Sequence, residues 1–141
     1  MIASISLKKF AKYCDSKYCV GMGKGLDALF LSLKASGIKE GGEVIVPSNT
    51  YIATALAVTY VGAAPVFVEP DICTFNINPS RIEEVITDKT KAIMPIHLYG
   101  QPCDRDSILT IVKNITSTLY RIVPRLMALH IKEKLLVLLE M

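Results

Sequence analysis

The chain has 141 residues, a length that fits one domain with its own hydrophobic core. Hydrophobic residues make up 51% of it and charged residues 21%, a composition that excludes a mainly disordered protein. The net charge is +3 and the charged residues are scattered, so the sequence predicts no nucleic-acid partner.

Helical and strand patterns alternate along the chain. In chain order the predicted elements are a helix at 5–13, a strand at 18–20, a helix at 26–35, a strand at 43–46, a helix at 51–60, a strand at 65–68, a helix at 80–86, a strand at 92–96 and a helix at 106–113. The strands are apolar without alternating polarity, and helices separate them. This pattern predicts an α/β fold with a mainly parallel sheet and flanking helices.

The segment 44–68 contains no charged residue and is long enough for a membrane span of about 20 residues. Pro47 and Pro65 lie inside it and Gly62 interrupts it again, so one continuous helix is not expected. The N-terminus has no pattern of an export signal. We therefore expect a cytoplasmic protein without membrane association, and keep association through 44–68 as an alternative.

The four cysteines, Cys14, Cys19, Cys73 and Cys103, form no C-x-x-C pair and have no histidines at zinc-site spacing. The sequence therefore predicts no metal site. Free, buried thiols in a reducing compartment are the expected state of these residues.

A glycine-rich turn at 21–25 lies between a predicted strand and the helix that begins with Leu26 and Asp27. The backbone N–H groups of such a turn, together with a helix N-terminus, can hold a phosphate group. The turn matches neither G-x-G-x-x-G nor a P-loop, and glycines at this place also serve a tight backbone alone. The turn by itself leaves both interpretations open.

Three further stretches favour the phosphate interpretation. They are 43–54 (EVIVPSNTYIAT), 61–68 (VGAAPVFV) and 95–102 (PIHLYGQP). With the glycine turn, and in this order and spacing, they resemble the DegT/DnrJ/EryC1/StrS family of pyridoxal-phosphate (PLP) dependent sugar aminotransferases. The resemblance covers roughly 10–113. It implies a partial large domain of a fold-type I PLP-dependent transferase.

The resemblance also implies roles for single residues. Gly25, Leu26 and Asp27 match the positions that hold the cofactor phosphate, although Lys24 stands where the family usually has Asn. Tyr51 matches the aromatic residue that stacks on the pyridine ring. With Leu at position 26, the turn is most similar to that of family members that aminate C3 of a dTDP-linked keto-deoxysugar. The family further implies a nucleotide-sugar substrate, glutamate as amino donor, a homodimer and a role in polysaccharide biosynthesis.

Two of these positions keep a structural alternative. A half-buried core tyrosine is the alternative for Tyr51. His97 follows a predicted strand, where α/β sites collect, but no Ser or Cys partner is identifiable. We therefore interpret His97 as a structural residue.

No position of the sequence matches either of the two residues that dominate the chemistry of this family. One is a Lys that holds the cofactor covalently, and the other is an Asp that pairs with the pyridine nitrogen. The family carries the Asp in an Asp-x-Ala-Gln-x-His-Gly stretch shortly beyond the position of Lys113, and the Lys later still. The chain continues differently from Asn114. We assign no catalytic residue and expect an inactive N-terminal fragment, with a non-catalytic phosphate-binding α/β module as the alternative.

The codons that can encode 114–141 recover the missing stretch when they are read one base earlier. The last base of each codon, joined to the first two of the next, permits Tyr-Asn-Leu-Tyr-Val-Ile-Gln-Asp-Cys-Ala-Gln-Ala-His-Gly. At Met127 and Ala128 there is no freedom, because ATG followed by GC gives a glycine codon where the motif requires glycine. We therefore expect an aminotransferase domain at 1–113 and an out-of-frame tail at 114–141. An amphipathic helix is the other interpretation of the tail.

Overall fold

The structure is a computed structural model that describes residues 2–13, 17–114, 118–119, 127–131 and 134–140. Its elements are α1 (Ile2–Tyr13), β1 (Tyr18–Met22), α2 (Gly25–Ala35), β2 (Glu43–Pro47), α3 (Ala53–Tyr60), β3 (Ala64–Val68), α4 (Pro79–Glu84), β4 (Thr90–Ile93), the 3₁₀ helix η1 (Leu98–Gly100), α5 (Arg105–Asn114), β5 (Thr118–Leu119), β6 (Met127–Ile131) and β7 (Lys134–Glu140). The predicted alternation of helices and strands is confirmed from α1 to α5.

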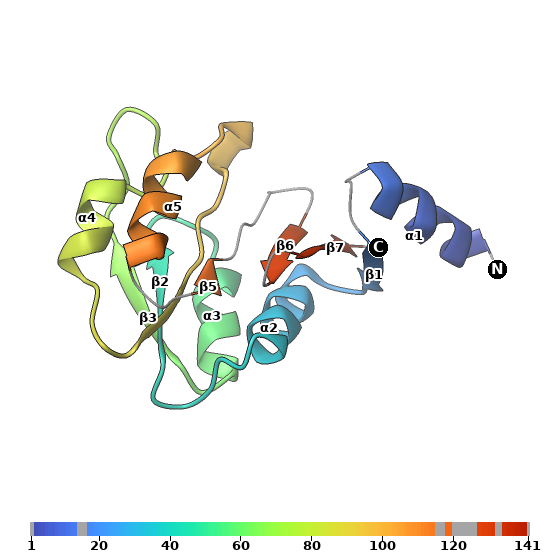
Figure 1. Ribbon diagram of the computed structural model, residues 1–141, viewed down its shortest axis with the longest axis horizontal. Coiled ribbons are helices and arrows are strands. Elements are labelled where there is room, and N and C mark those ends of the chain that lie inside the picture. Colours follow the sequence, from blue (N-terminus) through green and yellow to red (C-terminus); the bar gives the residue numbers. More distant parts are fainter. Residues whose placement is uncertain (1, 14–16, 115–117, 120–126, 132–133, 141) are drawn as a thin grey trace.

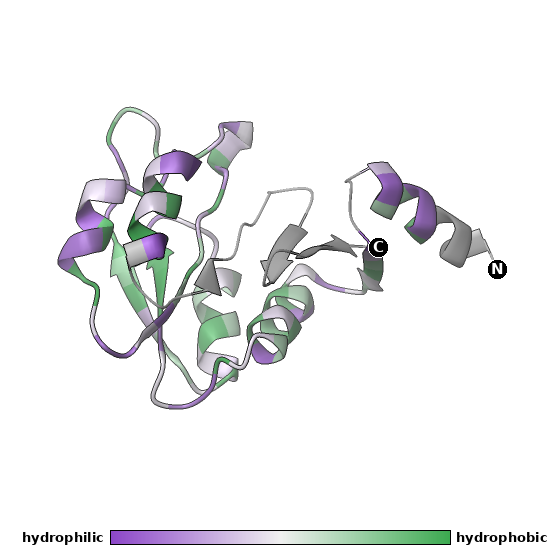
Figure 2. Cartoon of the chain, viewed as in Figure 1, coloured by the Kyte–Doolittle hydropathy of each residue, from purple (hydrophilic) through white to green (hydrophobic). Residues whose placement is uncertain are grey.

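A four-stranded parallel sheet in the order β3-β2-β4-β5 forms the centre of the fold. Helices α2 and α3 lie on one side of it and α4 and α5 on the other (Figure 1). Figure 2 shows hydrophobic residues along β2 and α3 and more hydrophilic ones along α4. The expected α/β class, with a mainly parallel sheet and flanking helices, is confirmed.

Successive residues of β2 face the two helical layers in turn, as the pleat of a strand requires. Val44 and Val46 lie in the buried cluster that includes residues of α2 and α3. Ile45, between them, lies in the other cluster with Ile82 of α4 and Ile108 of α5. An uninterrupted apolar strand is therefore what a sheet covered on both faces needs.

Glycine and proline set several element ends. Gly37 has φ +78°, the left-handed conformation that ends many helices, and it follows α2 as expected. The strand predicted at 92–96 ends earlier, at Ile93. The N–H of Met94 still donates to the carbonyl of Ile45 at 2.8 Å. Pro95 then has no N–H to continue the ladder.

The tail pairs with β1 apart from the central sheet. β7 runs parallel to β1 and antiparallel to β6. The helical interpretation of the tail is therefore wrong, since both β6 and β7 are strands. A continuous apolar run such as 135–139 suits a strand as well as a helix, and β7, which contains this run, pairs along β1 from Tyr18 to Met22.

The uncharged segment 44–68 folds as three separate elements, since it contributes to β2 and forms α3 and β3. A single membrane-crossing helix would need this segment to be continuous. Among the helices of the described ranges, none has the length and apolar character to cross a bilayer.

Candidate functional site

The carboxyl edge of the parallel sheet gathers the loops that follow β2, β3 and β4. Ligands of open α/β sheets bind at this edge. The loops are joined by hydrogen bonds from side chains. Asn49, after β2, donates from Nδ2 to the carbonyl of Phe75 at 2.9 Å. Asn76 bonds to the loop after β4. Neither asparagine carries a local sequence signal, because their partners lie 22 to 26 residues away in the chain.

Tyr51 lies in the loop between β2 and α3, and its side chain is 80% exposed. The backbone is fixed there, because the carbonyl of Tyr51 accepts from the N–H of Thr54 at 3.0 Å. A half-buried core tyrosine, the structural alternative, is therefore wrong. An anchored backbone with an exposed ring suits a residue that stacks on a ligand.

Gly25, Leu26 and Asp27 form the first turn of α2. Lys24 occupies the N-cap position, and its side chain makes no capping hydrogen bond. A lysine has no acceptor with which to cap N–H groups. The first turn therefore presents backbone donors that no side chain caps, at the positive end of the helix dipole.

The glycine turn also leaves room beside its backbone. A Cβ placed on Gly23 would meet no heavy atom within 4 Å, and the φ of Gly23 is not left-handed. Neither packing nor backbone conformation of the described residues requires glycine at this position. Open space next to uncapped N–H groups fits a phosphate group.

The two parts of the predicted site begin adjacent helices. Helices α2 and α3 pack side by side, with the glycine turn before one and Tyr51 before the other (Figure 1). No hydrogen bond between the described residues joins Tyr51 to the first turn of α2. The first turn of α2 thus fits the phosphate of PLP and Tyr51 fits its ring, as two separate contacts.

His97 is buried, and its Nδ1 accepts from the N–H of Cys103 at 3.0 Å. This bond closes the loop after β4 and agrees with the structural interpretation of His97. Cys103 is buried and Cys19 is partly buried, but Cys73 is exposed, so the expectation of buried thiols is wrong for Cys73. Cys14 lies outside the described residues. In the ranges the structure describes, His, Cys, Asp and Glu form no group of three that could hold a metal ion.

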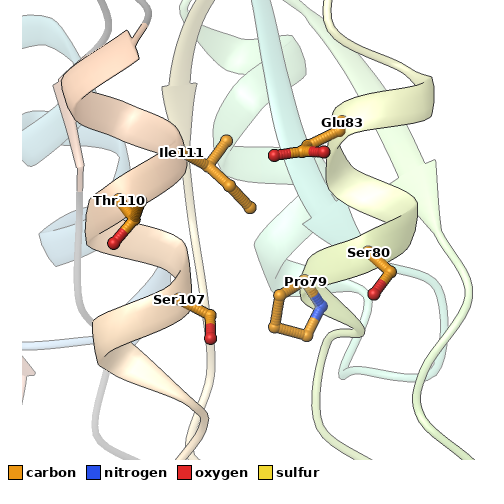
Figure 3. Close-up of a pocket in the computed structure, with 6 residues that line it drawn as sticks. All are labelled: Pro79, Ser80, Glu83, Ser107, Thr110 and Ile111. Atoms are coloured by element: carbon orange, nitrogen blue, oxygen red, sulfur yellow. The ribbon is translucent and has the colours of Figure 1, made fainter.

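A separate hollow of about 300 Å³ lies between α4 and α5 (Figure 3). It is lined by Pro79, Ser80, Glu83, Ser107, Thr110 and Ile111. These residues include none of the predicted site residues, and the hollow lies in the helical layer opposite α2 and α3. It is therefore distinct from the candidate site.

Asp71 organises the loop after β3. Its Oδ1 accepts from the N–H of Thr74 at 2.9 Å, the N–H of Cys73 at 3.0 Å and the hydroxyl of Thr74 at 3.1 Å. The backbone bond from Thr74, followed by that from Cys73, lowers the pKa of Asp71 below its ordinary value of 3.8. Hydrogen bonds that favour the charged form act in this direction.

This lowered pKa predicts acid sensitivity of the loop. The folded-state pKa is below the unfolded one, so the stabilisation is complete above the unfolded value and is lost as the pH falls through the folded value. An NMR titration should give the Asp71 carboxyl a midpoint below 3.8. Asp71→Asn should remove this titration. Asp104, whose pKa is lowered by hydrogen bonds from the side chain and the N–H of Ser107, should titrate as before. A midpoint at or above the ordinary value for Asp71 contradicts the assigned hydrogen bonds.

Solved structures define the class of protein. DesV of S. venezuelae, solved with a ketimine intermediate, is 43% identical with a TM-score of 0.78, over 81% of this chain and 31% of that one. NtdA of Bacillus subtilis, solved with bound PMP, is 36% identical with a TM-score of 0.79, over 82% of this chain and 26% of that one. 3-Amino-5-hydroxybenzoic acid synthase is 31% identical with a TM-score of 0.82, over 84% of this chain and 31% of that one. The fold is thus part of a PLP-dependent aminotransferase domain, as expected.

The model of the DegT/DnrJ/EryC1/StrS aminotransferase family matches residues 7–119, and the chain belongs to this family. It is 61% identical over 106 residues to dTDP-3-amino-3,6-dideoxy-alpha-D-galactopyranose transaminase of Aneurinibacillus thermoaerophilus. It is 54% identical over 106 residues to GDP-perosamine synthase of Caulobacter vibrioides. Each match covers 75% of this chain and 29% of the relative. The chain therefore spans less than a third of the length of these relatives.

Proposed function

We propose that the native protein is a homodimeric PLP-dependent aminotransferase that moves an amino group from glutamate to a nucleotide-linked keto-sugar. The observation that carries this proposal is the family match over 7–119. The 61% identity to a transaminase whose name specifies a dTDP-linked 3-amino sugar favours dTDP as the nucleotide and C3 as the aminated carbon. The similarity to a GDP-perosamine synthase makes the GDP-linked sugar the comparison substrate in any assay.

PLP, when bound, supplies the electron sink through which an amino group is exchanged. The backbone N–H groups of Gly25, Leu26 and Asp27 would hold its phosphate, since no side chain caps them. The exposed ring of Tyr51 would orient the pyridine by stacking. These residues bind and orient, and none of them moves a proton.

We also propose that 1–113 is the native aminotransferase sequence and that 114–141 is out of frame. The family match ends at residue 119, which is close to the proposed break. Thr118 and Leu119 pair in parallel with β4, and the recovered frame puts tyrosine and valine, two good strand formers, at these positions. In the recovered frame the Asp follows shortly afterwards in the sequence.

The absence of the catalytic Lys from the matched part predicts no covalent cofactor adduct. Purified chain treated with PLP and borohydride should give no stoichiometric adduct at a single lysine, and it should show no turnover with glutamate and either nucleotide sugar. Mass spectrometry of the reduced chain checks this. A stoichiometric single-site adduct contradicts the proposal of an inactive chain. Reversible PLP binding without an adduct favours the alternative, a non-catalytic phosphate-binding module.

The stacking role predicts a measurable loss in the frame-repaired enzyme. Tyr51→Ala should weaken PLP binding about fivefold, which corresponds to roughly 1 kcal/mol, the contribution of an aromatic pair. Tyr51→Phe keeps the ring and should bind PLP as the parent does. Equilibrium dialysis gives both dissociation constants. Equal binding by the alanine variant would overturn the stacking assignment.

A further inference from the structure

The loop after β4 holds a tyrosine in an unfavourable backbone conformation. Tyr99, inside η1, has φ +53°, and Gly100 follows with φ +78°. A left-handed conformation is uncommon for a residue with a Cβ, and for a bulky residue it requires support from its surroundings. The Tyr99 side chain is 87% exposed, so its own packing supplies little of that support.

The amide of Asn76 supports this loop from the interior. Its Oδ1 accepts from the N–H of Leu98 at 3.0 Å. Its Nδ2 donates to the carbonyls of Gln101 at 3.1 Å and Pro102 at 3.3 Å. One buried side chain, 3% exposed, thus bonds to the backbone on both sides of Tyr99.

Asn76 is held by a backbone bond within the loop after β3, next to a residue that bonds to the loop preceding Tyr51. Its carbonyl accepts from the N–H of Asp71 at 2.8 Å. The preceding residue, Phe75, has φ +56°, and its carbonyl accepts from Asn49 Nδ2. Asn49 lies two residues before Tyr51. The hydrogen bonds of two adjacent residues, Phe75 and Asn76, therefore connect the loop of Tyr51 to the loop of Tyr99.

We propose that Asn76 is a positioning residue, which holds the loop 98–102 in its left-handed turn and so presents Tyr99 to the substrate at the carboxyl edge of the sheet. The presentation of Tyr99 to a substrate rests on the proposed aminotransferase function. The placement of the loop by Asn76 does not rest on it. A buried amide that satisfies three backbone groups is costly to remove, because those groups are left without partners.

The first experiment follows the two halves of the amide separately by NMR on the 141-residue chain. Asn76→Ala should raise the exchange rate of the Leu98 amide at least tenfold and shift the carbonyl carbon signals of Gln101 and Pro102. Asn76→Asp keeps the acceptor and loses the donor. It should shift the two carbonyl signals while the Leu98 amide stays protected.

Asn78→Ala is the matched control. Asn78 caps α4 by accepting from the N–H of Ser80 at 3.0 Å, and it has no bond to the loop 98–102. Its loss should leave all three loop signals unchanged. If Asn78→Ala moves them as much as Asn76→Ala does, the effect is a general loss of stability and the proposal is overturned. Unchanged loop signals in Asn76→Asp overturn it as well.

The second experiment uses the frame-repaired enzyme. Asn76→Ala should raise KM for the nucleotide sugar at least fivefold while PLP absorbance is retained and kcat changes less. Asn78→Ala should leave KM unchanged. Unaltered KM in Asn76→Ala overturns the positioning role in catalysis. A repaired parent that binds no PLP would instead refute the proposed function, and the NMR result would still decide the placement of the loop.

Discussion

Inserting one base into the codons around Lys113, with the native downstream gene, is expected to convert a chain that forms no PLP adduct into a homodimeric enzyme that binds PLP. The restored frame returns the Asp that keeps the pyridine nitrogen protonated, because an opposite charge at close range favours the charged form. The downstream frame is expected to supply the Lys. Absorbance of bound PLP, the mass of the borohydride-reduced protein and the molar mass in solution measure the three parts of this result.

Insertion of three bases at the same place is the matched control. It adds one residue near the C-terminal end of α5 and leaves the reading frame of the tail unchanged, so it should restore neither cofactor binding nor dimerisation. Equal recovery with one and with three bases would attribute the gain to the length of the connection. If the one-base repair binds no PLP, the family function fails for this gene. An uninterrupted frame in the DNA, without family sequence in the neighbouring frame, overturns the out-of-frame proposal.

The same repair is expected to improve the sheet. β5 contains only Thr118 and Leu119 and pairs with Ala92 and Ile93 of β4. The recovered sequence at this place, Leu-Tyr-Val-Ile, is a longer run of strand-forming residues. A longer β5 would cover more of the open edge of β4 and bury more apolar area. It would also replace the leucine-rich run 135–139, which we expect to expose an apolar patch and promote aggregation.

The central elements were predictable because local sequence and tertiary environment agree in them. β2 is apolar and buried between two helical layers from Val44 to Pro47, and Gly37 takes the left-handed conformation that its place after α2 requires. The run 135–139 was not predictable, because an apolar run of that length suits both a helix and a strand. Pairing with β1, far away in the sequence, and with β6 favours the strand.

The site was predictable only in part, for a related reason. The uncapped first turn of α2 follows from neighbouring residues, since Lys24 cannot cap it. The role of Asn76 follows from contacts with residues 98–102, more than 20 positions away. A single sequence carries no local signal for such a contact. The strained backbone of Tyr99 likewise becomes apparent only when the loop is seen in place.

Ile45→Ala is expected to destabilise the chain by about 2–5 kcal/mol, a large share of the roughly 5–15 kcal/mol of a typical domain. Ile45 is fully buried at the middle of β2. Its cluster joins the sheet to α4 and α5 and also contains Val68, Ile77, Ile82, Ile93, Cys103, Ile108 and Ile111. Truncation to alanine leaves a cavity between two rigid layers, and close-packed surroundings collapse only partly into it.

Two further variants serve as references for the size of this loss of stability. Ile45→Val removes one methylene at the same site and should cost about 0.5–1.5 kcal/mol. Ile72→Ala removes a side chain that is 82% exposed, and should change stability by less than about 0.5 kcal/mol. Urea unfolding gives the free energy of unfolding of each of the three variants, and these values are comparable where the m-value is unchanged. If Ile45→Ala costs no more than Ile72→Ala, the side of the central sheet that faces α4 and α5 is not a packed core.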